Sequence, residues 1–275
     1  METKTKEILM PAFKLTIEEM AAILAITRSP NILGLPNPLF GTMDEEKIKT
    51  LLSAGERSLI ARDFLSYPTE EEIQFNPILL TVVGPVIMPD LSLIITSYPS
   101  EGAPIIEYFQ RSRSLYVKRM SVAEGVYLFE GIKDAEAFLS AIHQRLDLPV
   151  CDDTYLNYAT TVPADFFEII NKLIKEPMEE KLLSYFNDIG LSEDRFMLLS
   201  RDLRDGVRSI SIIFLRHGKD SLVSKGLSLW IAPSRIWMAE PILKNETEMN
   251  FGLYTGKEMK NMIEAILTTA ETMNS

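Results

Sequence analysis

An internal repeat is the feature of this sequence that most constrains its fold. Each half begins with apolar residues at helical spacing, continues with runs of alternating apolar residues, and ends in one more amphipathic helix. The ends agree in detail, because Gly131 and Gly256 each follow a predicted strand and precede a helix that closes on an Ala-Ile pair. We therefore predict an α+β fold built by duplication of a unit of helices, antiparallel sheet and helix, with pseudo-two-fold symmetry.

The first repeat opens with a capping box, in which Thr16 and Glu19 satisfy each other's backbone donors at a helix start. Asp134 is the expected cap of the helix that ends this repeat. Further helices are predicted over 44–64 and 77–83, and strands over 91–97, 105–111, 115–120 and 125–129.

The second repeat replays this order. Pro163 occupies a position typical of the first turn of a helix, and Gly190 is the expected stop between two further helices. Those helices are predicted over 178–189 and 192–203, the strands over 209–215, 226–231, 235–240 and 249–254, and the last helix after Gly256.

The repeat sets the expected domain boundaries. The segment 147–162 contains Pro149 and clusters of polar residues, and we interpret it as the linker. The alternatives are two α+β domains, 1–148 and 149–275, or one continuous domain that contains both repeats.

Composition excludes several classes of protein. The chain has 28 basic and 39 acidic side chains, so its net charge of -11 argues against a nucleic-acid binder, which needs a basic face. The lone cysteine, Cys151, forbids an intrachain disulfide, and no signal peptide is visible. The longest uncharged stretch, 74–89, is too short to span a membrane. We expect a soluble cytoplasmic protein.

Candidate catalytic residues are few. The two histidines, His143 and His217, are far apart in the sequence and are expected to have surface or capping roles. Asp152 and Asp153 follow Cys151 and disfavour its thiolate. A loop between Gly252 and Lys257 lacks the spacing of a phosphate-binding loop. We therefore expect no enzyme activity, no cofactor and no metal site.

Two tryptophans are the candidate partner-binding residues. Trp230 and Trp237 lie on a predicted hairpin, on the face opposite its aliphatic side chains. They either pack in the core beneath helices or, if exposed, form part of an apolar protein contact. Burial of both would exclude such an exposed patch.

The order and spacing of elements resembles the EspG family, cytoplasmic chaperones associated with type VII secretion. Local sequence agrees: 54–57 reads Ala-Gly-Glu-Arg, 59–62 reads Leu-Ile-Ala-Arg, a helix begins near Pro77, and 162–165 reads Val-Pro-Ala-Asp before a helix. The resemblance covers nearly the whole chain. It implies a quasi-two-fold monomer that binds a helical secretion substrate and keeps it soluble, and it assigns no binding residue.

The sequence thus favours a non-enzymatic cytoplasmic adaptor or chaperone for another protein. The alternative is a small-molecule-binding protein or enzyme with a pocket between the repeats, using tyrosines such as Tyr108, Tyr116 or Tyr254. A homodimer with purely structural duties is a third possibility.

Overall fold

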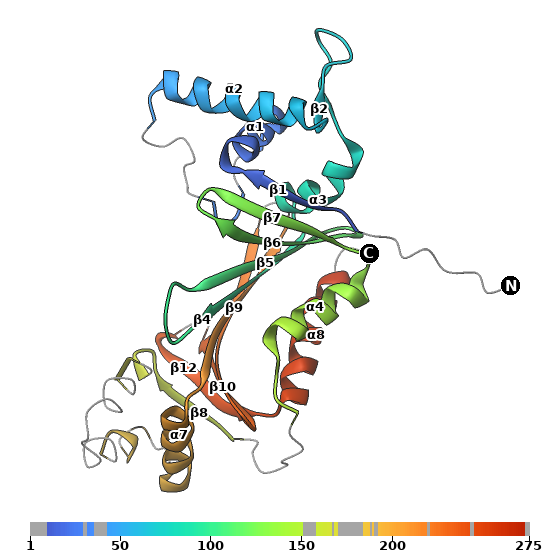
Figure 1. Ribbon diagram of the computed structural model, residues 1–275. Helices are drawn as coiled ribbons and strands as arrows, with labels where there is room; N and C mark the ends of the chain where they lie inside the picture. The colour runs from blue at the N-terminus through green and yellow to red at the C-terminus, as the bar shows by residue number, and fades with distance from the viewer. Residues whose placement is uncertain are drawn as a thin grey trace, which may run out of the picture. The chain divides into compact units, whose positions relative to one another are not determined.

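A large antiparallel sheet with helices makes up the computed structural model of the chain, so the expected α+β class is confirmed (Figure 1). The structure describes residues 10–29, 32–35, 43–150, 158–166, 168–169, 184–187, 189, 192–218, 221–242 and 245–272. The elements of the first half are β1 (Ala12–Thr16), α1 (Ile17–Thr27), α2 (Glu45–Ala61), β2 (Leu65–Ser66), β3 (Gln74–Phe75), α3 (Pro77–Ile87), β4 (Leu91–Tyr98), β5 (Ile105–Ser112), β6 (Leu115–Ala123), β7 (Val126–Ile132) and α4 (Ala135–Leu146). Those of the second half are β8 (Tyr158–Pro163), α7 (Glu193–Asp205), β9 (Arg208–His217), β10 (Leu222–Ala232), β11 (Arg235–Ile242), β12 (Asn245–Tyr254) and α8 (Gly256–Thr272).

The strand order of the sheet reads alike from its two edges. The order is β1-β7-β6-β5-β4-β9-β10-β11-β12-β8, and β2 pairs separately with β3. In each half the first strand lies at an edge beside the last strand, with Ala12 opposite Glu130 and Pro163 opposite Glu248. This is the order that a duplicated unit would give, while the duplication and its pseudo-two-fold axis both stay predictions.

The short edge strands β1 and β8 were not predicted. The linker expected over 147–162 overlaps β8, because residues from Tyr158 onward pair with β12. Pro163, expected in the first turn of a helix, is instead the last residue of β8, a position at a sheet edge where proline is tolerated. The predicted helix 178–189 lies mostly outside the described residues, and Cys151 with its two aspartates lies wholly outside them.

The capping box at α1 is confirmed and anchors the first helix pair. The Thr16 amide donates to Glu19 Oε2 at 2.9 Å, and the Glu19 amide donates to Thr16 Oγ1 at 3.3 Å. The buried Glu19 carboxylate also accepts from Ser58 and Arg62 of the following segment, each at 2.8 Å. These bonds join α1 to α2, which lies beside it in Figure 1.

The contacts within the chain divide it into two compact units. Unit 1 comprises Met1–Leu93, Ile106–Ile142 and Leu215–Val223, and unit 2 comprises Ile94–Ile105, His143–Phe214 and Ser224–Ser275. Each unit therefore takes most of its residues from one half and a short segment from the other. The domain boundary expected near residue 148 stays a prediction.

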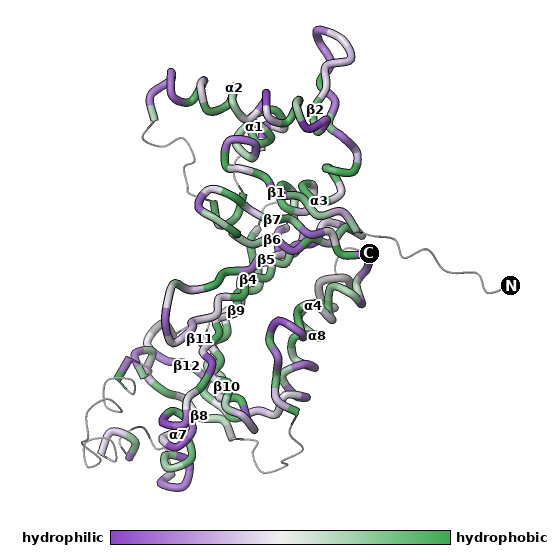
Figure 2. The backbone as a smooth tube through the Cα atoms, viewed as in Figure 1, coloured by the Kyte–Doolittle hydropathy of each residue, from purple (hydrophilic) through white to green (hydrophobic). Residues whose placement is uncertain are grey.

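Each unit has its own hydrophobic core. In unit 1, helices α1 and α3 lie over one face of β1, β6 and β7, and α2 packs on α1 (Figure 1). The apolar side chains of these helices form one core with Leu15, Val117 and Phe129 of the strands. In unit 2, Phe166, Phe186, Phe196 and Phe251 pack with the two tryptophans. Figure 2 shows hydrophobic residues along β9 and β10 as well. Among the described helices, none is both long and apolar enough to cross a bilayer.

Candidate protein-binding surface

The two tryptophans lie in the core of unit 2. Trp230 and Trp237 are opposite each other on β10 and β11 and are 9% and 0% exposed. The Trp237 indole stacks on Phe251 at 5.5 Å between ring centroids, and its Nε1 donates to the buried Asp202 of α7 at 2.8 Å. Core packing is thus confirmed, and the expectation of an exposed tryptophan patch is wrong because this hairpin face is covered.

The histidines form no catalytic group. His217 bonds Ser92 Oγ at 3.1 Å, and Gln110 donates to the same hydroxyl at 3.3 Å. Ser92 is fully buried, so this trio links β9, β4 and β5 without offering an accessible nucleophile. His143 Nε2 lies 3.8 Å from Glu264. Burial lowers the pKa of each imidazole below its ordinary value.

Among the described residues, neither potential metal ligands nor the tyrosines Tyr108, Tyr116 and Tyr254 gather at one place. Within the described part of the chain, no group of three His, Cys, Asp or Glu side chains could hold a metal ion. Tyr108 lies over Arg119, whereas Tyr116 packs on Phe138 at 5.1 Å. Tyr116 pairs with Arg111, three positions along β5 from Tyr108, so the two tyrosines face opposite sides of the sheet. Tyr254 is half-buried in unit 2.

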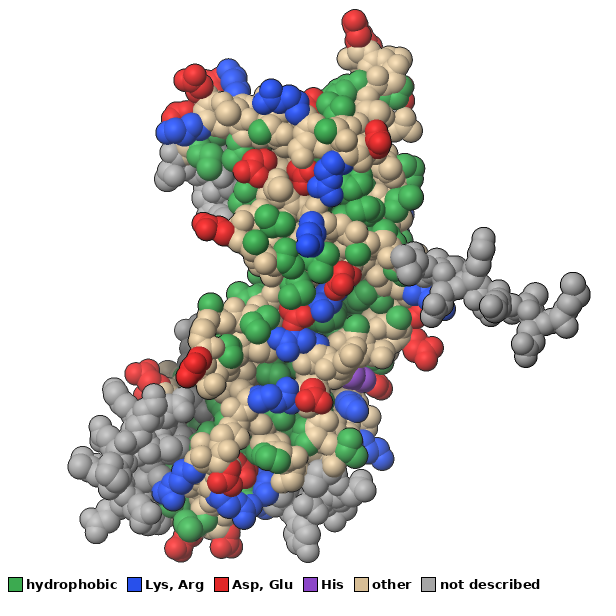
Figure 3. Space-filling view, viewed as in Figure 1, with side chains coloured by type: hydrophobic (Ala, Val, Ile, Leu, Met, Phe, Trp, Pro, Cys, Tyr) green, Lys and Arg blue, Asp and Glu red, His purple; other side chains and the backbone are tan. Residues whose placement is uncertain are grey.

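Large apolar side chains are exposed around the β2–β3 hairpin and the start of α3. We call this group of side chains the β2–α3 surface; each is between 41% and 56% exposed, and the group comprises Ile60, Tyr67, Ile73, Ile78 and Leu80. The space-filling view shows hydrophobic side chains gathered beside β2 and α3 (Figure 3). Contiguous apolar surface of this kind is typical of an interaction site.

A rigid base holds the β2–α3 surface in place. The hairpin pairs Leu65 with Phe75, and the Asn76 amide that follows donates to Phe64 O at 2.9 Å. The Asn76 side chain then caps α3 by accepting from the Ile78 amide at 2.9 Å. Beneath the surface, Leu65 and Leu79 belong to the buried core of unit 1. The exposed side chains are therefore presented by ordered elements.

Acidic groups border this apolar surface. The connection between β2 and β3 carries the exposed Glu70, Glu71 and Glu72. On α2, Glu56 accepts a hydrogen bond from the Tyr67 hydroxyl. That hydrogen bond is the main reason that the pKa of Tyr67 is raised. The surface thus has an apolar centre with acidic groups along its β2–β3 side, while Arg57 and Arg62 lie beside Ile60.

A smaller apolar face lies on β4 and β9 in unit 2. The bond between Ser92 and His217 shows that even-numbered β4 residues and odd-numbered β9 residues face the same side. On that side, Tyr98 and Ile213 are exposed, while the opposite side is buried. Two exposed apolar side chains make a weaker case for binding than the five of the β2–α3 surface.

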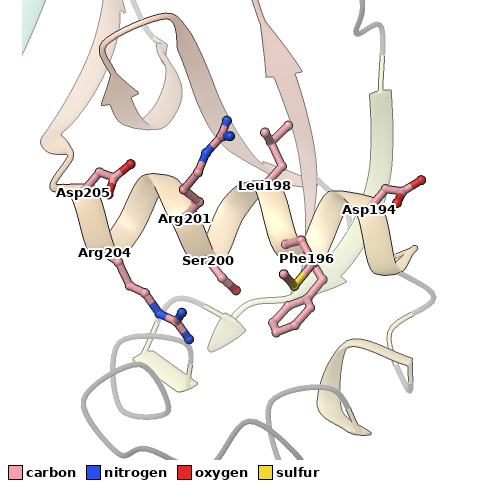
Figure 4. A pocket seen from close by; sticks show the side chains of 8 residues that line it. Asp194, Phe196, Leu198, Ser200, Arg201, Arg204 and Asp205 are labelled. Carbon is pink, nitrogen blue, oxygen red and sulfur yellow. The ribbon is translucent and has the colours of Figure 1, made fainter.

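A cavity of about 640 Å³ lies along α7, and the described residues of its lining do not converge on one point. Figure 4 shows Arg201 and Leu198 on one side of the helix, with Ser200, Arg204 and Phe196 on the other. Ligand sites usually place a few polar groups around one enclosed space. This lining therefore gives little support to a small-molecule site.

Sequence reasoning missed the β2–α3 surface. Ile60, Ile78 and Leu80 lie directly beside the buried Leu59 and Leu79 in the sequence, so a single sequence cannot separate them from the core. The available signal was the three glutamates between Tyr67 and Ile73, which mark an exposed connection with an apolar residue on either side.

Comparisons with known proteins identify the fold. No protein-family model and no curated protein matches the sequence. The chain is similar to a solved structure of the Mycobacterium tuberculosis type VII secretion system chaperone EspG5 in complex with a PE25-PPE41 dimer. The identity is 10%, the TM-score is 0.58, and the alignment covers 94% of this chain and 96% of that chain. The expected resemblance to the EspG fold is thereby confirmed.

Proposed function

We propose that this chain is a non-enzymatic cytoplasmic adaptor or chaperone that binds another protein through the β2–α3 surface. The observation that carries the proposal is the cluster of exposed apolar side chains on a rigid base. Exposing these side chains to water is unfavourable, and a partner that covers them gains their burial.

The fold supports the same class of function. EspG5 is described as a chaperone and was solved with a bound protein pair. We extend that role to this chain and propose a helical, secreted protein as its partner.

The chemistry of the surface defines the partner further. An amphipathic helix can place an apolar face on Ile73 and Ile78 and fill the centre of the surface. Basic residues beside that face would lie near Glu56 and Glu70–Glu72, where opposite charge speeds encounter and fixes orientation. We therefore expect a partner helix with a basic rim.

Capture from the host's own lysate tests the proposal. The tagged wild-type chain is compared with an Ile73→Ser/Ile78→Ser variant and with a control, Leu222→Ser/Val223→Ser, which changes apolar residues of similar exposure elsewhere in unit 1. Mass spectrometry should find one partner at near stoichiometry with the wild type and the control. The surface variant should recover less than about a tenth as much, as expected when central contacts are lost.

The other outcomes are distinct. Equal recovery by the surface variant would show that the partner binds elsewhere, for example on the smaller face of β4 and β9. Recovery of no protein, or of a second copy of the chain alone, would contradict the proposed function. If only a second copy is recovered, the molar mass from light scattering would show whether the chain is a homodimer.

A further inference from the structure

A buried arginine without a carboxylate partner lies in unit 1. Arg119 of β6 is 0% exposed, and among the described residues no carboxylate pairs with it and its Nε and Nη1 have no hydrogen-bond partner. Its guanidinium lies over the Tyr108 ring at 4.2 Å and near the Tyr127 ring at 5.7 Å. Burial lowers the pKa of Arg119 to about 10, so the group still carries its charge at neutral pH. A buried cation with idle donors is costly to keep.

A tight turn covers this arginine. The turn runs from Ile32 to Leu35, closed by the Leu35 amide donating to Ile32 O at 3.1 Å. Gly34 has φ +76, as the third position of a type II turn requires, and it lies directly on Tyr108. The side chains of Ile32 and Leu35 are buried and hold the turn to the core.

The turn also bonds the guanidinium directly, because Arg119 Nη2 donates to the Leu33 carbonyl. A guanidinium binds a carboxylate with two parallel bonds through either its Nε and Nη2 or its Nη1 and Nη2. Nη2 has two N–H groups, so its bond to Leu33 leaves a second N–H that can join Nε or Nη1 in such a pair. A carboxylate bound there would neutralise the buried charge and use a donor that is now idle. It can reach the guanidinium only when the turn moves, because Arg119 is 0% exposed beneath the turn.

We propose that Arg119, Tyr108 and Tyr127 form a latent carboxylate-binding site that the turn 32–35 keeps closed. The ligand carries one carboxylate, which pairs with the guanidinium between the two rings once the turn moves aside. Because a ligand favours the state that it binds, the carboxylate shifts the turn toward its open position. The site is separate from the β2–α3 surface and does not depend on the proposed function.

Gly34→Ala is the variant that opens the site. An added Cβ would lie 2.0 Å from the Tyr108 hydroxyl, and the φ of +76 is strained for alanine, so the turn cannot keep its position. Gly226→Ala is the matched control, because no atom lies within 4 Å of its added Cβ. Leu35→Ser removes a buried side chain that holds the turn to the core. It is the second variant for releasing the turn, to be used if Gly34→Ala loses cooperative unfolding.

The measurement is a titration of the full chain followed by the ¹H–¹⁵N resonance of Arg119 Nε, assigned by its loss in Arg119→Lys. Sodium acetate is compared with sodium chloride at equal ionic strength. In the Gly34→Ala chain, the resonance should shift saturably with acetate. The apparent Kd should be at least about tenfold lower than in the wild type and in Gly226→Ala, because the closed state no longer competes with the ligand. An equal response to chloride, or no saturable shift in Gly34→Ala and Leu35→Ser, would overturn the site.

A second arm identifies the source of the carboxylate. A blocked tripeptide with one glutamate replaces acetate in the same titration. Tighter binding of the peptide than of acetate supports a protein side chain as the ligand, and equal or weaker binding supports a free small carboxylate. Either result requires the Arg119 site.

Discussion

Buried polar contacts decide where the largest side chains of this chain can lie. The clearest example is Trp237, whose indole is fully buried and needs an acceptor for its N–H. Asp202 supplies that acceptor from α7 and also lies 3.4 Å from Arg235 Nε. The helix, the hairpin and the tryptophan thus fix one another through a single carboxylate.

Replacing Trp237 by phenylalanine should therefore cost more than the lost ring volume suggests. Asp202 would remain buried without its indole donor, and we expect a loss of about 1–3 kcal/mol in the free energy of unfolding from that change. Urea denaturation of the wild type, Trp237→Phe, Asp202→Ala and the double variant measures the coupling. Additive costs of the two single changes would contradict a direct role for this hydrogen bond.

The sequence allowed core packing of the tryptophans but could not decide between it and an exposed patch. Periodicity correctly placed Trp230 and Trp237 on one face of a hairpin, but which face of a sheet is covered depends on α7, a helix more than twenty residues earlier in the chain. The same limit applies to Arg119, since its cover, the turn 32–35, comes from a part of the chain far from β6.

At the scale of elements, local signals were sufficient where caps and alternation were strong. The capping box at Thr16 and the cap at Asp134 lie where α1 and α4 begin, and the long strands β4 to β7 and β9 to β12 follow their apolar alternation. The edge strands β1 and β8 were not predicted because they are too short, at five and six residues, to show a clear alternation. Their pairing with the last strand of each half supplies the stability that local sequence does not.

Close packing of α1 on α2 gives an element-scale prediction at Gly55. Alanine in a helix interior usually stabilises relative to glycine by about 0.5–1 kcal/mol. Here a Cβ would lie 2.0 Å from the Glu18 carbonyl oxygen, so Gly55→Ala should instead destabilise by about 1–3 kcal/mol, in the range of overpacked cores. Thermal unfolding followed by circular dichroism compares it with Ser53→Ala, an exposed change in the same helix. An unchanged or raised Tm for Gly55→Ala would show that the helices can separate without cost.

At the scale of the whole molecule, the strand order and the composition of the units point in different directions. The order β1-β7-β6-β5-β4 followed by β9-β10-β11-β12-β8 assigns five strands of the sheet to each half. The compact units do not respect that division, since the segment 94–105 belongs with the second half and 215–223 with the first. The two halves of the sequence therefore form units that share segments, which the sequence pattern alone did not indicate.

This sharing predicts that neither half is stable alone. The polypeptide 1–148 would lack the segment Leu215–Val223 of unit 1, and 149–275 would lack Ile94–Ile105 of unit 2, so each would leave apolar strand surface without its neighbours. Expressed separately, each half should unfold without a cooperative transition, whereas the two halves expressed together should associate and regain one. Circular dichroism melts of the separate and combined halves, beside the full chain, make the comparison. Cooperative unfolding of an isolated half would show that this half is an independent domain. It would then hold its strands in place without the segment that the other half supplies.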